Sequence, residues 1–197
     1  MGRMTPLVFL WPYALLFWAA FVWTFFPEYG IVAAPVSPST RAQDAGSKAM
    51  IVFGQALAML AAFAIARLVP SATLPHRVYL FWIGIAVFVA GGLLRRHCKR
   101  MLGSSFTGDV IVRADQAVVD RGAYRYVRHP SYSAGLLIFA GIGLALANGI
   151  GLMILLLIVI GGYAYRVRVE ERALATTIGD PYREYMQRTR RFIPFLF

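Results

Sequence analysis

The chain has 197 residues, of which 59% are hydrophobic and 15% are charged, and its 20 Lys and Arg residues outnumber its 9 Asp and Glu residues to give a formal net charge of +11. Soluble domains are about 45–50% apolar by a similar count, so this composition predicts a membrane core with basic edges. It argues against a nucleic-acid-binding protein, in which basic residues are usually spread over a soluble face. The single cysteine, Cys98, excludes a disulfide within the chain.

Uncharged stretches long enough to cross a bilayer recur along the chain. One crossing needs about 20 mostly apolar residues. The longest uncharged stretch, 130–165, is too long for one straight helix, and the turn-forming pair Asn148-Gly149 divides it into a hairpin of two short helices. Both a full crossing and a re-entrant hairpin fit this stretch. The predicted spans are about 5–27, 49–67, 78–95, 131–147 and 150–166.

The sequence therefore predicts an all-α integral membrane protein with about five transmembrane helices, built as a single membrane-embedded domain over 1–197. The first loop, the loop after the third span and the C-terminal tail hold 17 of the 20 Lys and Arg residues. Because basic loops tend to stay in the cytoplasm, we expect the C-terminus in the cytoplasm and the N-terminus outside, in an inner (cytoplasmic) membrane or its equivalent. Two cytoplasmic segments, about 95–130 and 166–197, result.

Several common site patterns are missing from the sequence. There is no G-x-G-x-x-G or G-x-x-x-x-G-K-[ST] pattern, and the cytoplasmic segments are too short for a soluble nucleotide-binding domain. His76, His97 and His129 are scattered, so we expect no metal site. The Gly-Ile-Gly steps at 141–143 and 149–151 predict close helix packing. A catalytic site would have to be assembled from the two basic segments and the helix ends that they join.

A first polar cluster, at 122–135, lies directly before the predicted hairpin. Pro130 suits the first position of a helix, where its missing N–H costs nothing. His129 and Arg128 would then lie at the positive end of that helix, which favours a carboxylate or a phosphate. The alternative is an interface belt of Arg, Tyr and His side chains that reach from the bilayer to water.

A second cluster, at 166–174, leaves the hairpin on the same side. Glu170 and Glu171 stand at the edge of the apolar stretch, where carboxylates are costly unless they are paired or used. They can accept hydrogen bonds from ribose hydroxyls or from an ammonium group. The alternative is an ordinary ion-pair network, with Glu170 four residues after Arg166. The hairpin brings both clusters to one membrane face, where a ligand with both charges would fit.

These two clusters resemble the isoprenylcysteine carboxyl methyltransferase family and, less closely, the phospholipid N-methyltransferases. The resemblance rests on Gly-x-Tyr-x-Tyr-x-Arg-His-Pro-x-Tyr-x-x-Gly at 122–135 and on Arg-x-x-x-Glu-Glu-x-x-Leu at 166–174. The segments at 95–107 and at 179–194 extend it, so that it covers about 90–197. The first two spans carry no motif.

The resemblance implies S-adenosylmethionine as the methyl donor, S-adenosylhomocysteine as the product and a small cytoplasmic cofactor-binding region. His129 would lie near the cofactor carboxylate, one or both of the adjacent glutamates would meet its ribose or amino group, and Arg95 would face the acceptor. No metal ligand is expected. The residues expected to bind the cofactor are Tyr124, Arg128, His129, Pro130, Tyr132, Glu170 and Glu171, and the expected catalytic residues are Arg95, Glu170 and Arg191.

The expected reaction is O-methylation of a carboxylate on a lipophilic, isoprenylcysteine-like acceptor that enters from the bilayer. Membrane lipids would be the other partners, and no nucleic acid is expected. Three alternatives stay open: N-methylation of a phospholipid or another amine, an NADPH-dependent reduction of sterols or other membrane lipids by a similar helical fold, and a non-enzymatic scaffold with basic edges that bind anionic lipids.

Overall fold

The computed structural model describes residues 5–32, 44–112 and 116–192, and its regular elements are all helices, with two isolated β-bridges besides. The predicted all-α fold class is confirmed for these residues. The main helices are α1 (Tyr13–Val32), α3 (Ser47–Leu68), α4 (Arg77–Leu102), α5 (Pro130–Leu146), α6 (Gly149–Thr177) and α7 (Asp180–Arg188). Short 3₁₀ helices are η1 (Leu7–Phe9), η2 (Pro70–Ala72), η3 (Gly103–Ser105) and η4 (Gly122–Arg125).

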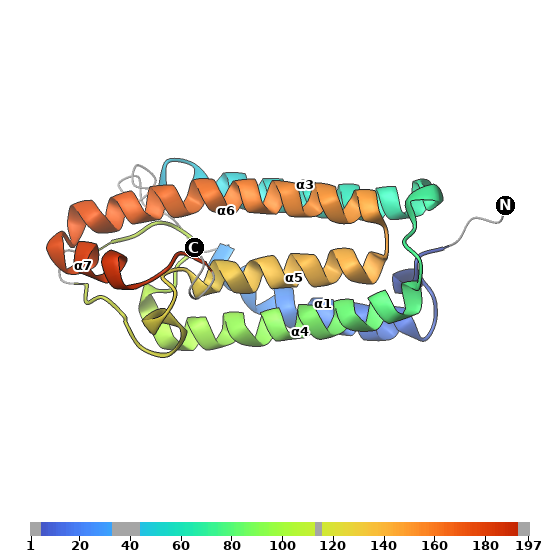
Figure 1. Cartoon of the computed structure of the whole chain (residues 1–197), viewed down its shortest axis with the longest axis horizontal. Helices are drawn as coiled ribbons and strands as arrows, with labels where there is room; N and C mark the ends of the chain where they lie inside the picture. The colour runs from blue at the N-terminus through green and yellow to red at the C-terminus, as the bar shows by residue number, and fades with distance from the viewer. Residues whose placement is uncertain (1–4, 33–43, 113–115, 193–197) are drawn as a thin grey trace.

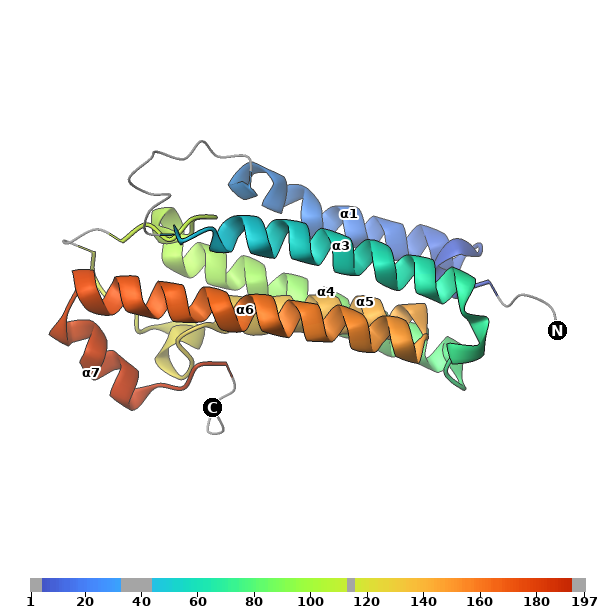
Figure 2. The same ribbon diagram turned by 90° about the horizontal axis from the view of Figure 1, so that it is seen from above.

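Five helices, α1, α3, α4, α5 and α6, run side by side along the long axis of the molecule (Figures 1 and 2). Helix α4 packs along α5, and α3 packs along α6. The α3–α4 connection and the α5–α6 turn lie at one end of the bundle, whereas α7 and the segment before α5 lie at the other. We call this second end, formed by α7 and the described residues of 103–129, the polar end.

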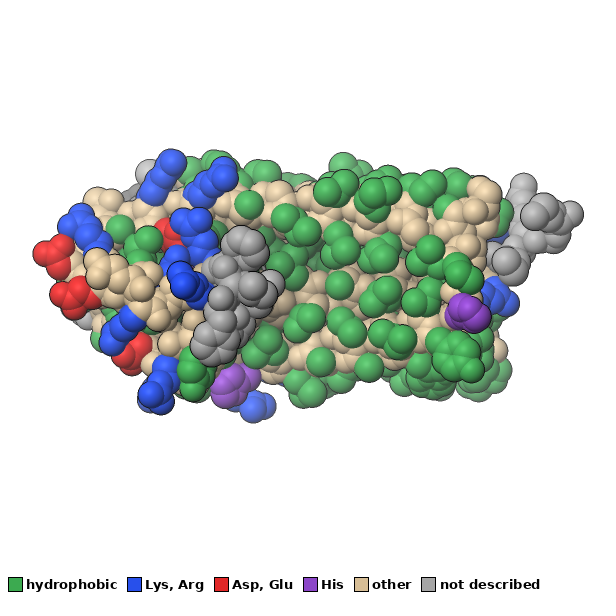
Figure 3. Space-filling model, viewed as in Figure 1, with side chains coloured by type: hydrophobic (Ala, Val, Ile, Leu, Met, Phe, Trp, Pro, Cys, Tyr) green, Lys and Arg blue, Asp and Glu red, His purple; other side chains and the backbone are tan. Residues whose placement is uncertain are grey.

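The surface divides into an apolar band and a charged end (Figure 3). Lys, Arg, Asp and Glu side chains gather at the polar end on the face in view, and hydrophobic side chains cover the bundle over most of its length. Within the described ranges, α3, α4 and α6 are long and apolar enough to cross a membrane, and α5 is a shorter apolar helix. The chain is therefore an integral membrane protein with several apolar helices.

Glycine allows α4 and α5 to pack at backbone contact. A Cβ added at Gly84 would lie 2.5 Å from the Ala145 nitrogen, and one at Gly91 would lie 2.8 Å from the Ala134 oxygen. A Cβ added at Gly141 would lie just as close to the Phe88 backbone. Close packing of this kind needs a residue without a side chain. The close helix packing predicted for the Gly-Ile-Gly steps at 141–143 and 149–151 is confirmed at Gly141, at Gly143 against Leu152 on α6, and at Gly151 against the Ala62 oxygen on α3.

The break in the longest apolar stretch falls where the sequence predicts it. Ala147 adopts a left-handed conformation with φ of 50°, and α6 begins at Gly149. The Asn148 side chain accepts a hydrogen bond from the Gly151 nitrogen at 3.0 Å and donates one to the Val69 oxygen at 3.0 Å. Asn148 therefore caps α6 and ties the α5–α6 turn to the neighbouring α3–α4 connection.

The first helix differs from the predicted span at 5–27. It begins only at Tyr13, after a 3₁₀ turn and a cis peptide bond before Pro12, and it continues through Val32. Pro27 lies inside it and offers no N–H to the Trp23 carbonyl one turn earlier. The Arg96 guanidinium donates to that carbonyl instead, at 2.6 Å, and lies 3.8 Å from the centroid of the Trp23 ring.

The prediction of two short hairpin helices is wrong for the second one. Helix α6 has 29 residues and continues beyond the apolar stretch through the whole Glu-Glu cluster. Arg, Glu, Ala and Leu, which favour helices, follow Tyr165, and no glycine or proline interrupts them before Gly179. In the same way α4 continues past Arg95 to Leu102. These extensions carry the charged side chains beyond the apolar band to the polar end.

Candidate functional site

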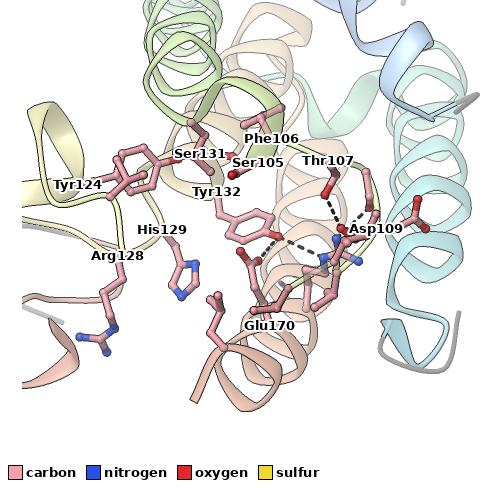
Figure 4. A pocket seen from close by; sticks show the side chains of 18 of the residues that line it. Ser105, Phe106, Thr107, Asp109, Tyr124, Arg128, His129, Ser131, Tyr132 and Glu170 are labelled. Carbon is pink, nitrogen blue, oxygen red and sulfur yellow. Dashed lines mark hydrogen bonds between the residues drawn. The ribbon is translucent and has the colours of Figure 1, made fainter. Parts of the chain in front are cut away.

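A large cavity opens at the polar end and reaches between the helices (Figure 4). It contains about 1370 Å³ of space between atoms, part of which is open to solvent. Its walls come from α1, α3, α4, α5, α6 and α7 and from the described residues of the segment 105–119. At its outer side lie Tyr182 and Tyr185, and between the helices lie Glu28, Gln55, Arg95 and Tyr163.

A chain of hydrogen bonds crosses the middle of this cavity. The Tyr132 hydroxyl donates to Glu170 Oε2 at 2.7 Å and accepts from Arg166 Nε at 3.1 Å (Figure 4). Tyr132 lies in the first turn of α5 and Glu170 in the polar last part of α6, so the hairpin brings the two sequence clusters together as predicted. Glu170 turns its carboxylate toward the cavity.

Glu171, although adjacent in sequence, is buried away from the cavity, with 5% of its surface exposed. Its carboxylate accepts hydrogen bonds from Arg128 Nε at 3.0 Å and from Arg191 at 2.8 and 3.1 Å, and His129 Nε2 lies 3.3 Å away. Burial alone would raise the pKa of Glu171, but the hydrogen bonds from His129, Arg191 and Arg128 lower it to about 2. The carboxylate is therefore ionised and already fully bonded at neutral pH.

The C-terminal tail is fastened to the start of α5 by backbone hydrogen bonds. The Arg128 nitrogen donates to the Arg190 oxygen at 2.6 Å, and the His129 nitrogen donates to the Arg191 oxygen at 3.0 Å. The Arg128 guanidinium also donates to the carbonyl groups of Met186 and Thr189. In Figure 4 this side chain points away from Tyr132 and Glu170. Arg128 thus joins α5, α6 and the tail.

The residues predicted from the sequence separate into two groups. Six line the cavity, namely Arg95, Tyr124, Arg128, His129, Tyr132 and Glu170. Pro130, Glu171 and Arg191 do not: Pro130 is the buried first residue of α5, and Arg191 is held against Glu171. The hydrogen bonds to Glu171 raise the pKa of Arg191 above its ordinary value, so the guanidinium stays charged. The predicted residues thus lie close together in the structure, but only some of their side chains face the cavity.

Arg166 forms its ion pair with Asp44, and not with Glu170 as in the ion-pair network that the sequence left open as an alternative. Its guanidinium donates to the Asp44 carboxylate, to Ser47 Oγ at 2.6 Å and to the Gly108 oxygen at 2.9 Å. Asp44 lies just before α3 and Ser47 is its first residue, in a part of the chain that carries no motif. The interaction therefore joins the first half of the chain to the cavity, and sequence periodicity along α6 alone could not reveal it.

Three further groups at the cavity were not predicted as site residues. Lys48 Nζ lies 2.9 Å from Asp109 Oδ2 at the wall formed by α3 and the 105–112 segment. The hydroxyl of Tyr182 is buried at the cavity and has no hydrogen-bond partner within the described ranges. A buried hydroxyl without a partner is rare.

Neutral phenols form the outer part of the cavity. Tyr185 donates its hydroxyl hydrogen to the Tyr124 oxygen at 2.6 Å, which fastens α7 to the segment before α5. Burial raises the pKa of Tyr185 to about 12, and burial also raises the pKa of Tyr182. Both phenols are therefore uncharged at neutral pH, and the Tyr185 hydroxyl is already used in its bond to Tyr124.

On the inner side of the cavity, Arg95 projects from α4. Its guanidinium donates to Glu28 Oε2 at 2.7 Å and to Ser131 Oγ at 3.2 Å. It also lies 5.4 Å from the centroid of the Phe106 ring. Arg95 is thus a planar, oriented cation between α1 and α5.

Comparison with known proteins relates this chain to methyltransferases. A family model described as phospholipid methyltransferase matches residues 79–180. The chain is 31% identical over 121 residues to protein-S-isoprenylcysteine O-methyltransferase B of Arabidopsis thaliana, covering 59% of this chain and 61% of that protein. It is 32% identical over 109 residues to protein-S-isoprenylcysteine O-methyltransferase of Schizosaccharomyces pombe, covering 54% of this chain and 46% of that protein. The chain thus spans less than two thirds of these relatives.

The fold also has a counterpart among solved structures. The eukaryotic intramembrane Ras methyltransferase, an isoprenylcysteine carboxyl methyltransferase, aligns with a TM-score of 0.62 at 22% identity over 94% of this chain and 68% of that one. At this identity the likeness concerns the fold alone. The sequence relatives confirm the resemblance inferred from the Arg-His-Pro and Glu-Glu clusters. Because the matched family model covers just over half of the residues, the chain belongs to the phospholipid methyltransferase family.

Proposed function

We propose that this protein transfers a methyl group from S-adenosylmethionine to a carboxylate of a lipophilic acceptor. The observation that carries the proposal is the single cavity that extends from the tyrosines of α7 at the polar end to Arg95 and Gln55 between the helices. One end can take a polar cofactor from water, and the other lies between the helices of the bundle. The names of the isoprenylcysteine O-methyltransferase relatives support the same reaction class.

The cofactor is proposed to bind among His129, Tyr132, Glu170 and Tyr182. His129 stands directly before the N-terminus of α5, and the positive end of the helix dipole there favours a carboxylate. Glu170 faces the cavity and can accept hydrogen bonds from ribose hydroxyls or an ammonium group, whereas Glu171 is already bonded to three neighbours. Tyr182 supplies a hydroxyl group that lacks a partner. Glu170 is therefore the glutamate assigned to the cofactor.

The reaction requires this chain mainly to align the acceptor with the methyl group of the cofactor. S-adenosylmethionine would supply a methyl group that its positively charged sulfur already activates. A carboxylate acceptor is ionised at neutral pH and needs no base, so orienting it against the methyl group can supply several kcal/mol of the barrier. Arg95 offers two parallel N–H groups for a carboxylate. An amine acceptor would need a base to take its proton, and Glu170 is the carboxylate placed to do so.

Titration with S-adenosylhomocysteine and with NADPH tests the cofactor assignment. We expect the purified protein to bind S-adenosylhomocysteine but not NADPH in calorimetry. The Glu170→Ala and His129→Ala variants should each bind it about ten- to hundredfold more weakly, since a hydrogen bond to a charged group contributes about 1.5–3 kcal/mol. If both variants bound S-adenosylhomocysteine with wild-type affinity, the two clusters would be only interface anchors and ion pairs. Tight NADPH binding would favour a reductase.

We further propose one membrane-embedded domain over 1–197, with five crossing helices and the polar end in the cytoplasm. The gathering of charged side chains at that end and the basic loops support this orientation. Met1 and Phe197, which mark the predicted outer and cytoplasmic ends, lie outside the described residues.

A reporter fused after Phe197 tests the orientation. A fused enzyme that is active only outside the cytoplasm should give no signal, because the C-terminal tail is expected to remain in the cytoplasm. The same reporter fused before Met1 serves as the control and should be active. The opposite pattern would reverse the topology and would place the cofactor cavity on the side that lacks cytosolic S-adenosylmethionine.

A further inference from the structure

Each Lys and Arg side chain that lines the cavity is already paired with an internal carboxylate, within the part of the chain that the structure describes. The four pairs are Lys48–Asp109, Arg95–Glu28, Arg128–Glu171 and Arg166–Asp44. A carboxylate acceptor therefore finds no free Lys or Arg among the described residues there. If such an acceptor is held by a guanidinium group, one internal carboxylate has to leave its arginine partner.

Three of the four carboxylates are poorly suited to leave. The side chains of Asp44, Asp109 and Glu171 are each at most 9% exposed. Asp44 also accepts hydrogen bonds from Ser47 and from the backbone of α3 and the 105–112 segment. Glu171 is bonded to Arg128, Arg191 and His129. Leaving an uncompensated charge in such places is costly.

Glu28 differs from them in exposure and in bonding. Its side chain is 20% exposed and lines the cavity, and its carboxylate bonds to Arg95 as its single hydrogen-bond partner within the described ranges. It can therefore move into the open part of the cavity and be hydrated there. Arg95 would keep its second contact, to Ser131, and would stay oriented.

The backbone around Glu28 also permits a local movement. Glu28 directly follows Pro27, whose ring removes the hydrogen bond that would close the preceding helical turn. The carbonyl left free on Trp23 is held by Arg96, the neighbour of Arg95 on α4. Arg96 thus anchors the part of α1 before Pro27. The turn that carries Glu28 is joined to α4 by one ion pair, with Arg95.

We propose that Glu28 is an internal substitute for the acceptor carboxylate, which occupies Arg95 until the acceptor displaces it. This inference rests on the proposed carboxylate methylation. It assigns the choice of acceptor partly to α1, which lies outside the segment matched by the family model. An acceptor with a carboxylate can replace Glu28 on the guanidinium, whereas the same lipid with a neutral amide cannot.

The test is equilibrium binding of N-acetyl-S-farnesylcysteine, a lipidated cysteine with a free carboxylate, and of its carboxamide to the full-length protein in detergent. We expect Glu28→Gln to bind the carboxylate about tenfold more tightly than the wild type, because the charged competitor is gone. Affinity for the carboxamide should stay unchanged. Glu184→Gln, which removes an exposed carboxylate on α7, should change neither. Glu28→Asp, which keeps the charge but shortens its reach, should fall between the wild type and Glu28→Gln.

Unchanged or weaker binding of the carboxylate by Glu28→Gln and by Glu28→Asp would overturn the inference. Equal gains for the carboxylate and the carboxamide would overturn it too, since they would indicate a wider cavity rather than a vacated cation. The proposed function fails separately: it is contradicted if the wild type binds both the lipid and S-adenosylhomocysteine but transfers no methyl group.

Discussion

Replacing Glu171 with glutamine should lower the free energy of unfolding by about 3 kcal/mol, the usual cost of removing one partner from a buried ion pair. The reason is that Arg128, His129 and Arg191 converge on this carboxylate, and its loss leaves buried Arg128 without a charged partner. The effect is expected as a clear drop in the melting temperature of the purified protein. Glu170→Gln should change the melting temperature far less, although it weakens cofactor binding.

The same carboxylate predicts how stability depends on pH. Because the pKa of Glu171 is lowered from 4.5 to about 2, its contribution is fully present above about pH 4.5 and is lost as the pH falls toward 2. Asp180→Asn is the matched control, since Asp180 pairs with Arg183 while its side chain is 82% exposed, and it should have little effect. A Glu171→Gln variant that melts like the wild type but no longer binds S-adenosylhomocysteine would reverse the assignment of the two glutamates.

Replacing Arg95 with lysine should reduce methyl transfer about a hundredfold while S-adenosylhomocysteine affinity stays within about twofold. Arginine presents a planar fork that matches a carboxylate, whereas lysine presents a point charge. A loss of about 2.7 kcal/mol of transition-state stabilisation corresponds to this factor. Turnover and affinity are measured on the same purified variant, so that a folding defect would appear in both.

Arg100→Lys is the matched control for this prediction. It makes the same chemical change at an exposed position on the same helix, outside the cavity, and should leave turnover unchanged. Near-normal turnover in Arg95→Lys would mean that Arg95 only reaches toward water from the apolar region, a task that lysine performs equally well. The acceptor carboxylate would then have to be held elsewhere in the cavity.

Local signals explain what could be predicted from the sequence. Uncharged stretches indicated where the helices of the bundle lie, and Asn148-Gly149 indicated the hairpin turn because both residues suit a tight turn. The hairpin in turn placed the Arg-His-Pro and Glu-Glu clusters at one end. Helix ends were less predictable, because α4 and α6 continue into polar sequence that still favours a helix.

The direction of individual side chains could not be predicted in this way. Consecutive residues on a helix point about 100° apart, so packing of α6 against α5 and the tail decides that Glu170 faces the cavity and Glu171 does not. The Arg191 contact depends on the path of the tail after α7. The partners of Arg95 and Arg166 are Glu28 and Asp44, which come from the first half of the chain, where no motif marks them.

Methyl transfer by the purified wild-type protein from S-adenosylmethionine with a labelled methyl group tests the proposed reaction itself. The acceptors are N-acetyl-S-farnesylcysteine, a fatty acid and phosphatidylethanolamine, each offered separately in detergent. We predict that the label enters a lipid carboxylate as a methyl ester that base releases, and that Glu170→Ala abolishes most of this transfer. Label found only on the amine of phosphatidylethanolamine, or on none of the acceptors although S-adenosylmethionine is bound, would contradict carboxylate methylation.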